Sequence, residues 1–137
     1  MISRVYDPEE CKQITKHYPD YFTFDEAKWF SNPANYAIRE GENIGFAEYK
    51  SPGVYLVHFC LHTARGREAI NLTKRFIDQL WEDMPITIAV GLVEENNKKA
   101  RWVLRQVGFE SSGFIDTADN GNCEMFSRTS PFTSKEF

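Results

Sequence analysis

One histidine stands in an otherwise apolar segment and is well suited to move a proton. His58 lies in the run from Gly53 to Leu61, which consists mostly of β-branched, aromatic and aliphatic residues. An imidazole titrates near neutral pH, so it can accept a proton from an attacking nucleophile. Tyr55 and His62 are alternative acid–base groups nearby. A core histidine satisfied by hydrogen bonds explains His58 equally well.

A glycine flanked by two arginines follows this segment. After Arg65-Gly66-Arg67, apolar residues recur from Ala69 to Met84 at intervals of three and four, which predicts an amphipathic helix. The start of a helix offers free backbone N–H groups and the positive end of its dipole, and glycine lets the backbone approach a ligand closely. The segment therefore predicts an anion site, although such a turn also occurs commonly without a ligand.

A second strand and helix follow the first pair. Residues 86–93 are apolar on both alternating faces, which predicts another buried strand. Asn97 is placed to cap the next helix, and Gly108 is placed to end it in a left-handed conformation. Glu94 and Glu95, between this strand and helix, are more distant acid–base candidates.

These motifs resemble those of a known superfamily. Asn97-x-x-Ala100, with Gly108-Phe109 eleven and twelve residues after the asparagine, resembles the closing motif of the GCN5-related N-acetyltransferases (GNAT). The segment Arg65–Ala69 resembles the acyl-CoA pyrophosphate loop of that family. The resemblance extends over about residues 36–128. It implies an enzyme that transfers an acyl group from acetyl-CoA to an amine by direct attack in a ternary complex.

The resemblance also implies roles for individual residues. Backbone groups near the end of the central strand would hold pantetheine and polarise the thioester carbonyl, and aromatic residues on earlier elements would shape the acceptor groove. The implied cofactor residues are Phe59, Cys60, Leu61, Arg65, Gly66, Arg67, Glu68, Ala69 and Asn97. The implied acceptor residues are Trp29, Phe30, Tyr36 and Tyr49. His58 and Tyr55 are the candidate catalytic residues.

Three positions depart from the family pattern. Glu68 replaces the usual Gly or Ala of the loop, and Thr63 replaces the usual Gln or Arg. Leu104 occupies the position of the tyrosine that reprotonates the thiolate in many members. An alternative is therefore a catalytically weak or inactive binding or structural protein, similar to the small GNAT-like proteins of tailed bacteriophages. An unrelated nucleotide-binding α/β fold is disfavoured by the absence of GxGxxG and Walker sequences.

The remaining elements complete a single α+β domain over residues 1–137. Capping signals at Asp7-Pro8 and at Thr23-Phe24-Asp25-Glu26 predict two helices, one ending near His17 and broken by Tyr18-Pro19. Alternating apolar runs predict hairpins over 36–49 and 109–126, and residues 130–137 read as a loose tail. We expect a mostly antiparallel sheet with flanking helices and one parallel strand pair, joined by a right-handed crossover. The resemblance implies that this parallel pair splays apart.

Composition limits the possible partners. The chain has 137 residues, 42% of them hydrophobic, and a net charge of −4, which argues against nucleic acid as its ligand. The three scattered cysteines and the absence of an apolar leader predict reduced thiols in a cytoplasmic protein. We expect no membrane partner and no metal, since His58 and His62 would lie about 13 Å apart on a strand. The expected partners are acyl-CoA and a small-molecule or protein amine; the oligomeric state is not indicated.

Overall fold

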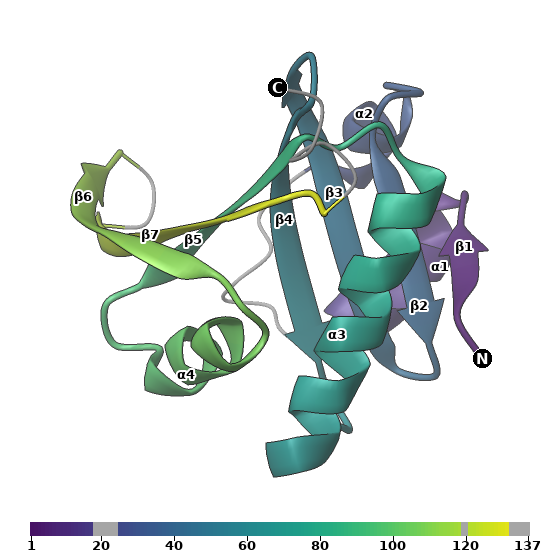
Figure 1. Cartoon of the computed structure of the whole chain (residues 1–137). Helices are drawn as coiled ribbons and strands as arrows, with labels where there is room; N and C mark the ends of the chain where they lie inside the picture. Colours follow the sequence, from purple (N-terminus) through teal and green to yellow (C-terminus); the bar gives the residue numbers. More distant parts are fainter. Residues whose placement is uncertain (18–24, 119–120, 132–137) are drawn as a thin grey trace.

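The computed structural model describes residues 1–17, 25–118 and 121–131. Its centre is a seven-stranded mixed sheet in the order β1-β2-β3-β4-β5-β7-β6 (Figure 1). The strands are β1 (Ser3–Val5), β2 (Tyr36–Glu40), β3 (Asn43–Ser51), β4 (Val54–Leu61), β5 (Ile88–Glu94), β6 (Glu110–Thr117) and β7 (Gly121–Thr129). All neighbouring strands are antiparallel except β4 and β5, which are parallel. The predicted fold class is confirmed.

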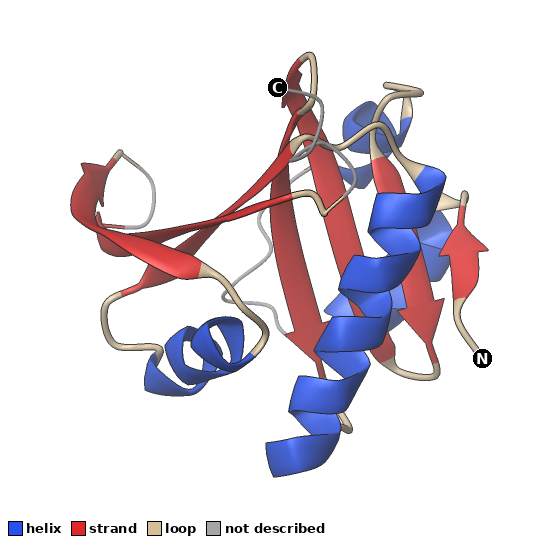
Figure 2. Cartoon of the chain, viewed as in Figure 1, coloured by secondary structure: helices blue, strands red, loops and turns tan. Residues whose placement is uncertain are grey.

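Four described helices flank the sheet: α1 (Pro8–Thr15), α2 (Glu26–Phe30), α3 (Gly66–Asp83) and α4 (Lys98–Gln106). Helix α3 lies across β2–β4 on one face, α1 and α2 lie behind the same strands, and α4 packs beside the β5–β7 half (Figure 2). The apolar residues form a large core under α3 and α4 and a smaller one under α1 and α2. The central strands are therefore covered on both faces, as their sequence predicts.

Side-chain caps fix where three helices begin. Asp7 Oδ1 accepts from Glu9 N (2.9 Å), Asp25 Oδ1 from Lys28 N (3.2 Å) and Asn97 Oδ1 from Ala100 N (3.2 Å). Each bond satisfies a backbone donor that the first helical turn leaves free. The predicted caps at Asp7 and Asn97 are thus confirmed, and within the second capping signal the residue that caps the helix is Asp25. Thr23 and Phe24 of the second signal, the break at Tyr18-Pro19 and residues 132–137 of the predicted tail lie outside the described residues.

The two chain ends differ from expectation. Strand β1 was not predicted, because its three residues are too few to show a periodicity; it pairs with β2 through Val5 and Ala37. Ser130, expected to begin a loose tail, is buried, and its N–H donates to Thr87 O at 2.8 Å. The sheet thus extends further along the chain at both ends than the sequence predicts.

The junction between β4 and β5 is short. Only Val54–Ile88, Tyr55–Ala89 and Leu56–Val90 are paired. Beyond Leu56, β4 continues beside β3 to Leu61, while β5 continues beside β7 to Glu94. The two strands therefore separate, and Figure 1 shows β5 and β7 turning away from β4. This is the splayed parallel pair that the resemblance implies.

Gly53 holds the closed end of this junction. Its carbonyl accepts from Thr87 N (2.8 Å) and Ile88 N (3.0 Å), and its φ is +77°. A Cβ here would lie 2.6 Å from Thr87 Oγ1. We expect Gly53→Ala to lower the free energy of unfolding by about 2 kcal/mol, since a left-handed non-glycine residue costs 1–3 kcal/mol. Urea unfolding would measure the change.

Gly41 is a matched control for this substitution. Its φ is +61°, but a Cβ there has no heavy atom within 4 Å. Gly41→Ala therefore carries the backbone strain without the Thr87 contact, and we expect a smaller loss of stability. Equal losses in the two variants would contradict the role assigned to the contact between Gly53 and Thr87.

Two further findings concern the described part of the chain. No helix within it is long and apolar enough to cross a membrane. Cys11, Cys60 and Cys123 are all buried, and the described residues contain no disulfide bond between them. Burial raises the pKa of Cys11 to about 12, helped by the nearby Glu26 carboxylate. Such a thiol is protonated at neutral pH and is a poor nucleophile.

Candidate active site

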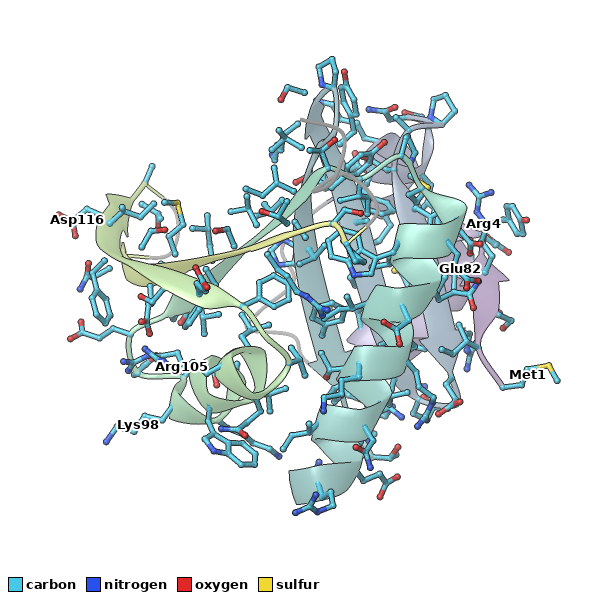
Figure 3. The ribbon with its side chains drawn as sticks, viewed as in Figure 1. Met1, Arg4, Glu82, Lys98, Arg105 and Asp116 are labelled. Carbon is cyan, nitrogen blue, oxygen red and sulfur yellow. The ribbon has the colours of Figure 1, made fainter. Side chains whose placement is uncertain are left out.

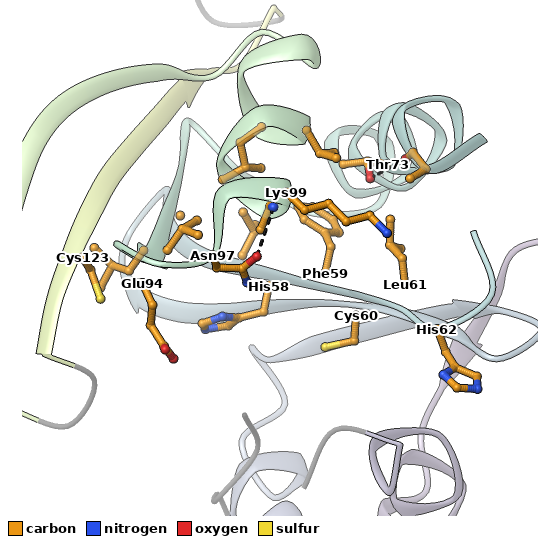
Figure 4. A pocket seen from close by; sticks show the side chains of 18 of the residues that line it. His58, Phe59, Cys60, Leu61, His62, Thr73, Glu94, Asn97, Lys99 and Cys123 are labelled. Carbon is orange, nitrogen blue, oxygen red and sulfur yellow. Dashed lines mark hydrogen bonds between the residues drawn. The ribbon is translucent and has the colours of Figure 1, made fainter. Parts of the chain in front are cut away.

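A cleft of about 510 Å³ occupies the space between the separated ends of β4 and β5. Its walls are the end of β4, the loop before α3, the first turns of α3 and α4, and the second half of β5, with Cys123 of β7 at one side (Figure 4). The cleft is open because three residue pairs are all that join the two strands. It lies where the splayed pair led us to expect a ligand.

The cleft has two sides because side chains alternate along a strand. Phe59 and Leu61 of β4 point toward α3 and α4, where Thr73 lies (Figure 4). His58, Cys60 and His62 point to the opposite side of the sheet, and Glu94 from β5 also points there. One side is thus bordered by two helix N-termini, and the other carries the imidazole and carboxylate groups.

His58 lines the cleft and is half-buried. Burial lowers the pKa of its imidazole; Glu48 opposes this effect and Lys50 adds to it. These two residues form an ion pair with each other at 3.0 Å. A pKa below the ordinary value of 6.5 keeps the imidazole neutral at pH 7, and a neutral imidazole can accept a proton.

Tyr55 does not lie where a catalytic group is needed. Its side chain is 3% exposed and packs edge-on against Tyr49, with ring centroids 5.7 Å apart, at the closed end of the junction. Burial raises the pKa of its phenol. Tyr55 belongs to the large core and does not line the cleft, so the geometry favours His58 over Tyr55 as the catalytic candidate.

The N-terminus of α3 lies at one end of the cleft and has no side-chain cap. The Arg65 carbonyl accepts from Glu68 N (3.1 Å) and Ala69 N (3.4 Å), so the first N–H groups of the helix remain for a ligand. Gly66 adopts a left-handed φ of +55°. The Arg65 guanidinium braces the loop by donating to His62 O (2.9 Å) and Ala64 O (3.3 Å).

The cofactor residues expected from the sequence divide into two groups. Those that line the cleft are Phe59, Cys60, Leu61, Arg65, Ala69 and Asn97. Gly66, Arg67 and Glu68 are exposed on the first turn of α3 and do not line it. Any contact from these three would therefore be made at the mouth of the cleft rather than inside it.

None of the four aromatic residues of the predicted acceptor groove lines the cleft. Trp29 and Phe30 pack against the smaller core, with Trp29 edge-on to Phe46. Tyr36 is 8% exposed and donates its hydroxyl to Asp83. Tyr49 lies near the closed end of the junction. These contacts join residues far apart in the chain, which the local sequence does not reveal.

Lys99 is a cleft residue that the sequence reasoning missed. It lines the cleft from the first turn of α4, and Figure 4 shows its side chain extending across the opening toward Leu61. Its position two residues after the capping Asn97 is the signal that could have identified it. Leu104 also lines the cleft; it is 6% exposed, and its Cδ1 would lie 3.1 Å from a Cβ on Gly91.

The described residues contain no cluster of three or more His, Cys, Asp or Glu side chains that could hold a metal ion. His62 is engaged elsewhere: its ring stacks on that of His17, with centroids 3.7 Å apart. His17 Nε2 lies 3.3 Å from a carboxylate oxygen of Glu42. The imidazole and carboxylate side chains that line the cleft in the described chain are thus His58, His62 and Glu94, of which His62 is stacked on His17.

Comparison with known proteins identifies the fold. No protein-family model and no curated protein sequence matches the chain. Solved structures do match. A chimera of Vibrio cholerae spermidine N-acetyltransferase SpeG with hSSAT superposes with a TM-score of 0.75 at 12% identity, covering 95% of this chain and 96% of that one. Aminoglycoside acetyltransferase AAC(6')-Ib with paromomycin and acetyl-CoA gives 0.72 at 13%, covering 100% and 97%.

A third match is the microcin C7 self-immunity acetyltransferase MccE in complex with acetyl-CoA and AMP, with a TM-score of 0.66 at 13% identity and coverage of 93% and 92%. These neighbours and the splayed β4–β5 pair define the class: the chain has the GNAT fold of acyl-CoA N-acyltransferases. At these identities the match concerns the fold, and the activity has to be argued from the residues of the cleft.

Proposed function

We propose that this protein is an acetyl-CoA-dependent N-acetyltransferase in which an amine attacks the thioester directly. The observation that carries the proposal is the early end of the β4–β5 pairing at Leu56–Val90, which leaves strand backbone bordering a cleft. Unpaired strand backbone binds an extended amide chain as it would another strand, and pantetheine is such a chain. Acetyl-CoA would supply the acyl group as an activated thioester.

The two sides of the cleft suit the two reactants. The α3 side offers an uncapped helix N-terminus and suits the pyrophosphate, while Phe59, Cys60 and Leu61 border the path of pantetheine. The opposite side carries His58 and Glu94 and suits the amine. Backbone N–H groups at the end of β4 would polarise the thioester carbonyl, as preorganised donors do for developing negative charge.

His58 is the proposed general base. As the amine nitrogen bonds to the carbonyl carbon, it loses a proton, and the neutral imidazole accepts it directly or through one water molecule. Glu94, on the same side of the cleft, would attract a protonated amine by its charge. Leu104 offers no proton to the departing thiolate, so in this proposal that proton comes from the His58 imidazolium or from solvent.

Binding of acetyl-CoA is the first test of this proposal. A ligand that binds only the folded state stabilises it, by about 2.7 kcal/mol at a concentration 100 times its Kd. We therefore expect acetyl-CoA to release or absorb heat in calorimetric titration and to raise the Tm. The absence of both effects at millimolar acetyl-CoA would overturn the proposed function.

A binding protein that holds acyl-CoA without turnover is the second candidate. Leu104, buried against the Gly91 backbone, favours it, because the usual position of the acid holds an apolar side chain. Incubating the protein with acetyl-CoA and a panel of amines, and measuring the free CoA thiol that is released, would distinguish the enzyme from the binding protein. Binding without acetylation of any amine would favour this second function, and acetylation would exclude it.

A further inference from the structure

We propose that one face of α4 binds the nucleotide end of acyl-CoA, with Lys99 contacting a phosphate and Trp102 stacking on the adenine. This inference rests on the proposed function, and it makes Lys99 and Trp102 two further residues that determine specificity for CoA. The α4 face is distinct from the N-terminus of α3, where the pyrophosphate loop is expected. It would make the cleft selective for CoA over acyl groups carried on shorter phosphopantetheine carriers.

Lys99 brings a free positive charge to the mouth of the cleft. It lines the cleft, and its side chain extends from the first turn of α4 toward Leu61 (Figure 4). Among the described residues no ion pair involves Lys99, whereas the neighbouring Arg101 is paired with Glu124 at 2.7 Å. An unpaired ammonium beside an uncapped helix N-terminus favours an anionic ligand.

Trp102 lies one helical turn beyond Lys99 and is 43% exposed. Residues three apart are neighbours on a helix surface, and helical side chains lean back toward the N-terminus. Trp102 thus covers the turn that carries Lys99, about 4.5 Å along the axis. The core contacts of α4 are made by Val103 and Leu104, so packing does not explain the exposed indole. An exposed indole ring suits stacking with a purine.

The charge distribution around the cleft supports this assignment. Glu68 places a negative charge on the first turn of α3, which opposes a phosphate there. The Arg65 guanidinium is already engaged by the carbonyl groups of His62 and Ala64. In contrast, Lys98 and Lys99 begin α4, with Lys99 directed into the cleft. Arg67 is exposed on that turn and does not line the cleft. Lys99 therefore supplies the positive charge on the opposite wall of the cleft.

The side chains in Figure 3 indicate a suitable control. Lys98, labelled there, projects from α4 away from the β4 half of the sheet. It is exposed and does not line the main cleft. Lys98→Gln therefore changes the net charge as much as Lys99→Gln does, without removing a cleft contact. For the indole, Trp102→Phe keeps an aromatic face, whereas Trp102→Ala removes it.

The test is calorimetric titration of wild-type protein and these four variants with CoA and with dephospho-CoA. We expect Lys99→Gln and Trp102→Ala each to raise the Kd for CoA about ten-fold, from one charge-assisted contact and one stacking contact respectively. Lys98→Gln should change it less than two-fold and Trp102→Phe only slightly. If the loss in Lys99→Gln disappears with dephospho-CoA, the contact is to the 3′-phosphate; if it persists, the contact is to the pyrophosphate.

A second readout reports stacking directly. CoA binding should quench the fluorescence of the wild-type protein, and the quench should be lost in Trp102→Phe. Wild-type affinity for CoA in both Lys99→Gln and Trp102→Ala, with no quench, would overturn this inference and leave the proposed function intact. Failure of the wild-type protein to bind any form of CoA would instead overturn the proposed function, and this inference with it.

Discussion

We expect the His58→Gln variant to acetylate an accepted amine about 100-fold more slowly than the wild type, since a positioned general base contributes 10²–10⁴-fold. Glutamine fills a similar volume but cannot accept the amine proton. Affinity for acetyl-CoA should change little, because His58 points to the opposite side of the sheet from α3 and α4. Initial rates of thiol release, measured together with calorimetric Kd values, would separate the two effects.

The pH profile distinguishes a base from a structural role for His58. Burial lowers the pKa of its imidazole, so the reactive neutral form prevails at neutral pH and is lost as the pH falls through that lowered pKa. The wild-type kcat/KM should therefore have an acid limb with a midpoint below 6.5, and His58→Gln should lack it. His17→Gln, outside the cleft, should keep the limb. An unchanged limb in His58→Gln would contradict the assignment.

The second large effect concerns Glu124, a buried carboxylate that joins α4 to the sheet. It is 2% exposed; Oε1 accepts from Arg101 Nε at 2.7 Å, and Oε2 accepts from Ser111 Oγ at 2.6 Å and from Arg105. Removing one partner of a buried ion pair costs 3–5 kcal/mol. Both guanidinium groups are partly exposed, so we expect the cost to lie at the low end of this range. Glu124→Ala should lower the free energy of unfolding, measured in urea, by about 3 kcal/mol.

The stability from Glu124 should also depend on pH. Burial alone would raise the pKa of this carboxyl, but the bonds from Ser111 and Arg101 and the charges of both arginines lower it overall. A lowered native pKa contributes stability above the ordinary value near 4.5, and this stability is lost as the pH falls through the native value. The difference between wild type and Glu124→Ala should therefore shrink in acid. A difference that is constant from pH 7 to pH 3, or equal to that of the exposed Glu110→Gln, would contradict this account.

The strands and helices that build the cleft could be predicted from local patterns. Residues 53–61 and 86–93 are apolar on both faces. Strand β4 forms within the first range, and β5 (Ile88–Glu94) overlaps the second but ends one residue beyond it. Asn97 caps α4 as its position indicates. The alternation of a strand also separates Tyr55 from His58. Which of the two side chains meets the cleft depends on where the pairing with β5 stops, and this is a tertiary property.

The positions of the four aromatic residues and of Lys99 relative to the cleft could not be predicted for a related reason. Tyr36 bonds Asp83, which lies 47 positions away in the chain, and this contact decides its structural role. Lys99 reaches the cleft because α4 packs beside α3. The spacing of residues in the sequence does not reveal how these two helices are placed in space. Sequence patterns thus predict the elements, while the lining of the space between them depends on packing.

The short junction between β4 and β5 links the rigidity of the sheet to the presence of a ligand in the cleft. The β1–β4 block and the β5–β7–β6 block are joined by three residue pairs between β4 and β5, by the Gly53 turn and by contacts between α3 and α4. A molecule lying in the cleft would touch both blocks at once and act as a removable crosslink between them. The binding free energy of the ligand would then include the entropy that the two blocks lose when their relative motion is restricted. A substitution that loosens the β4–β5 junction would therefore weaken binding without altering any residue that contacts the ligand.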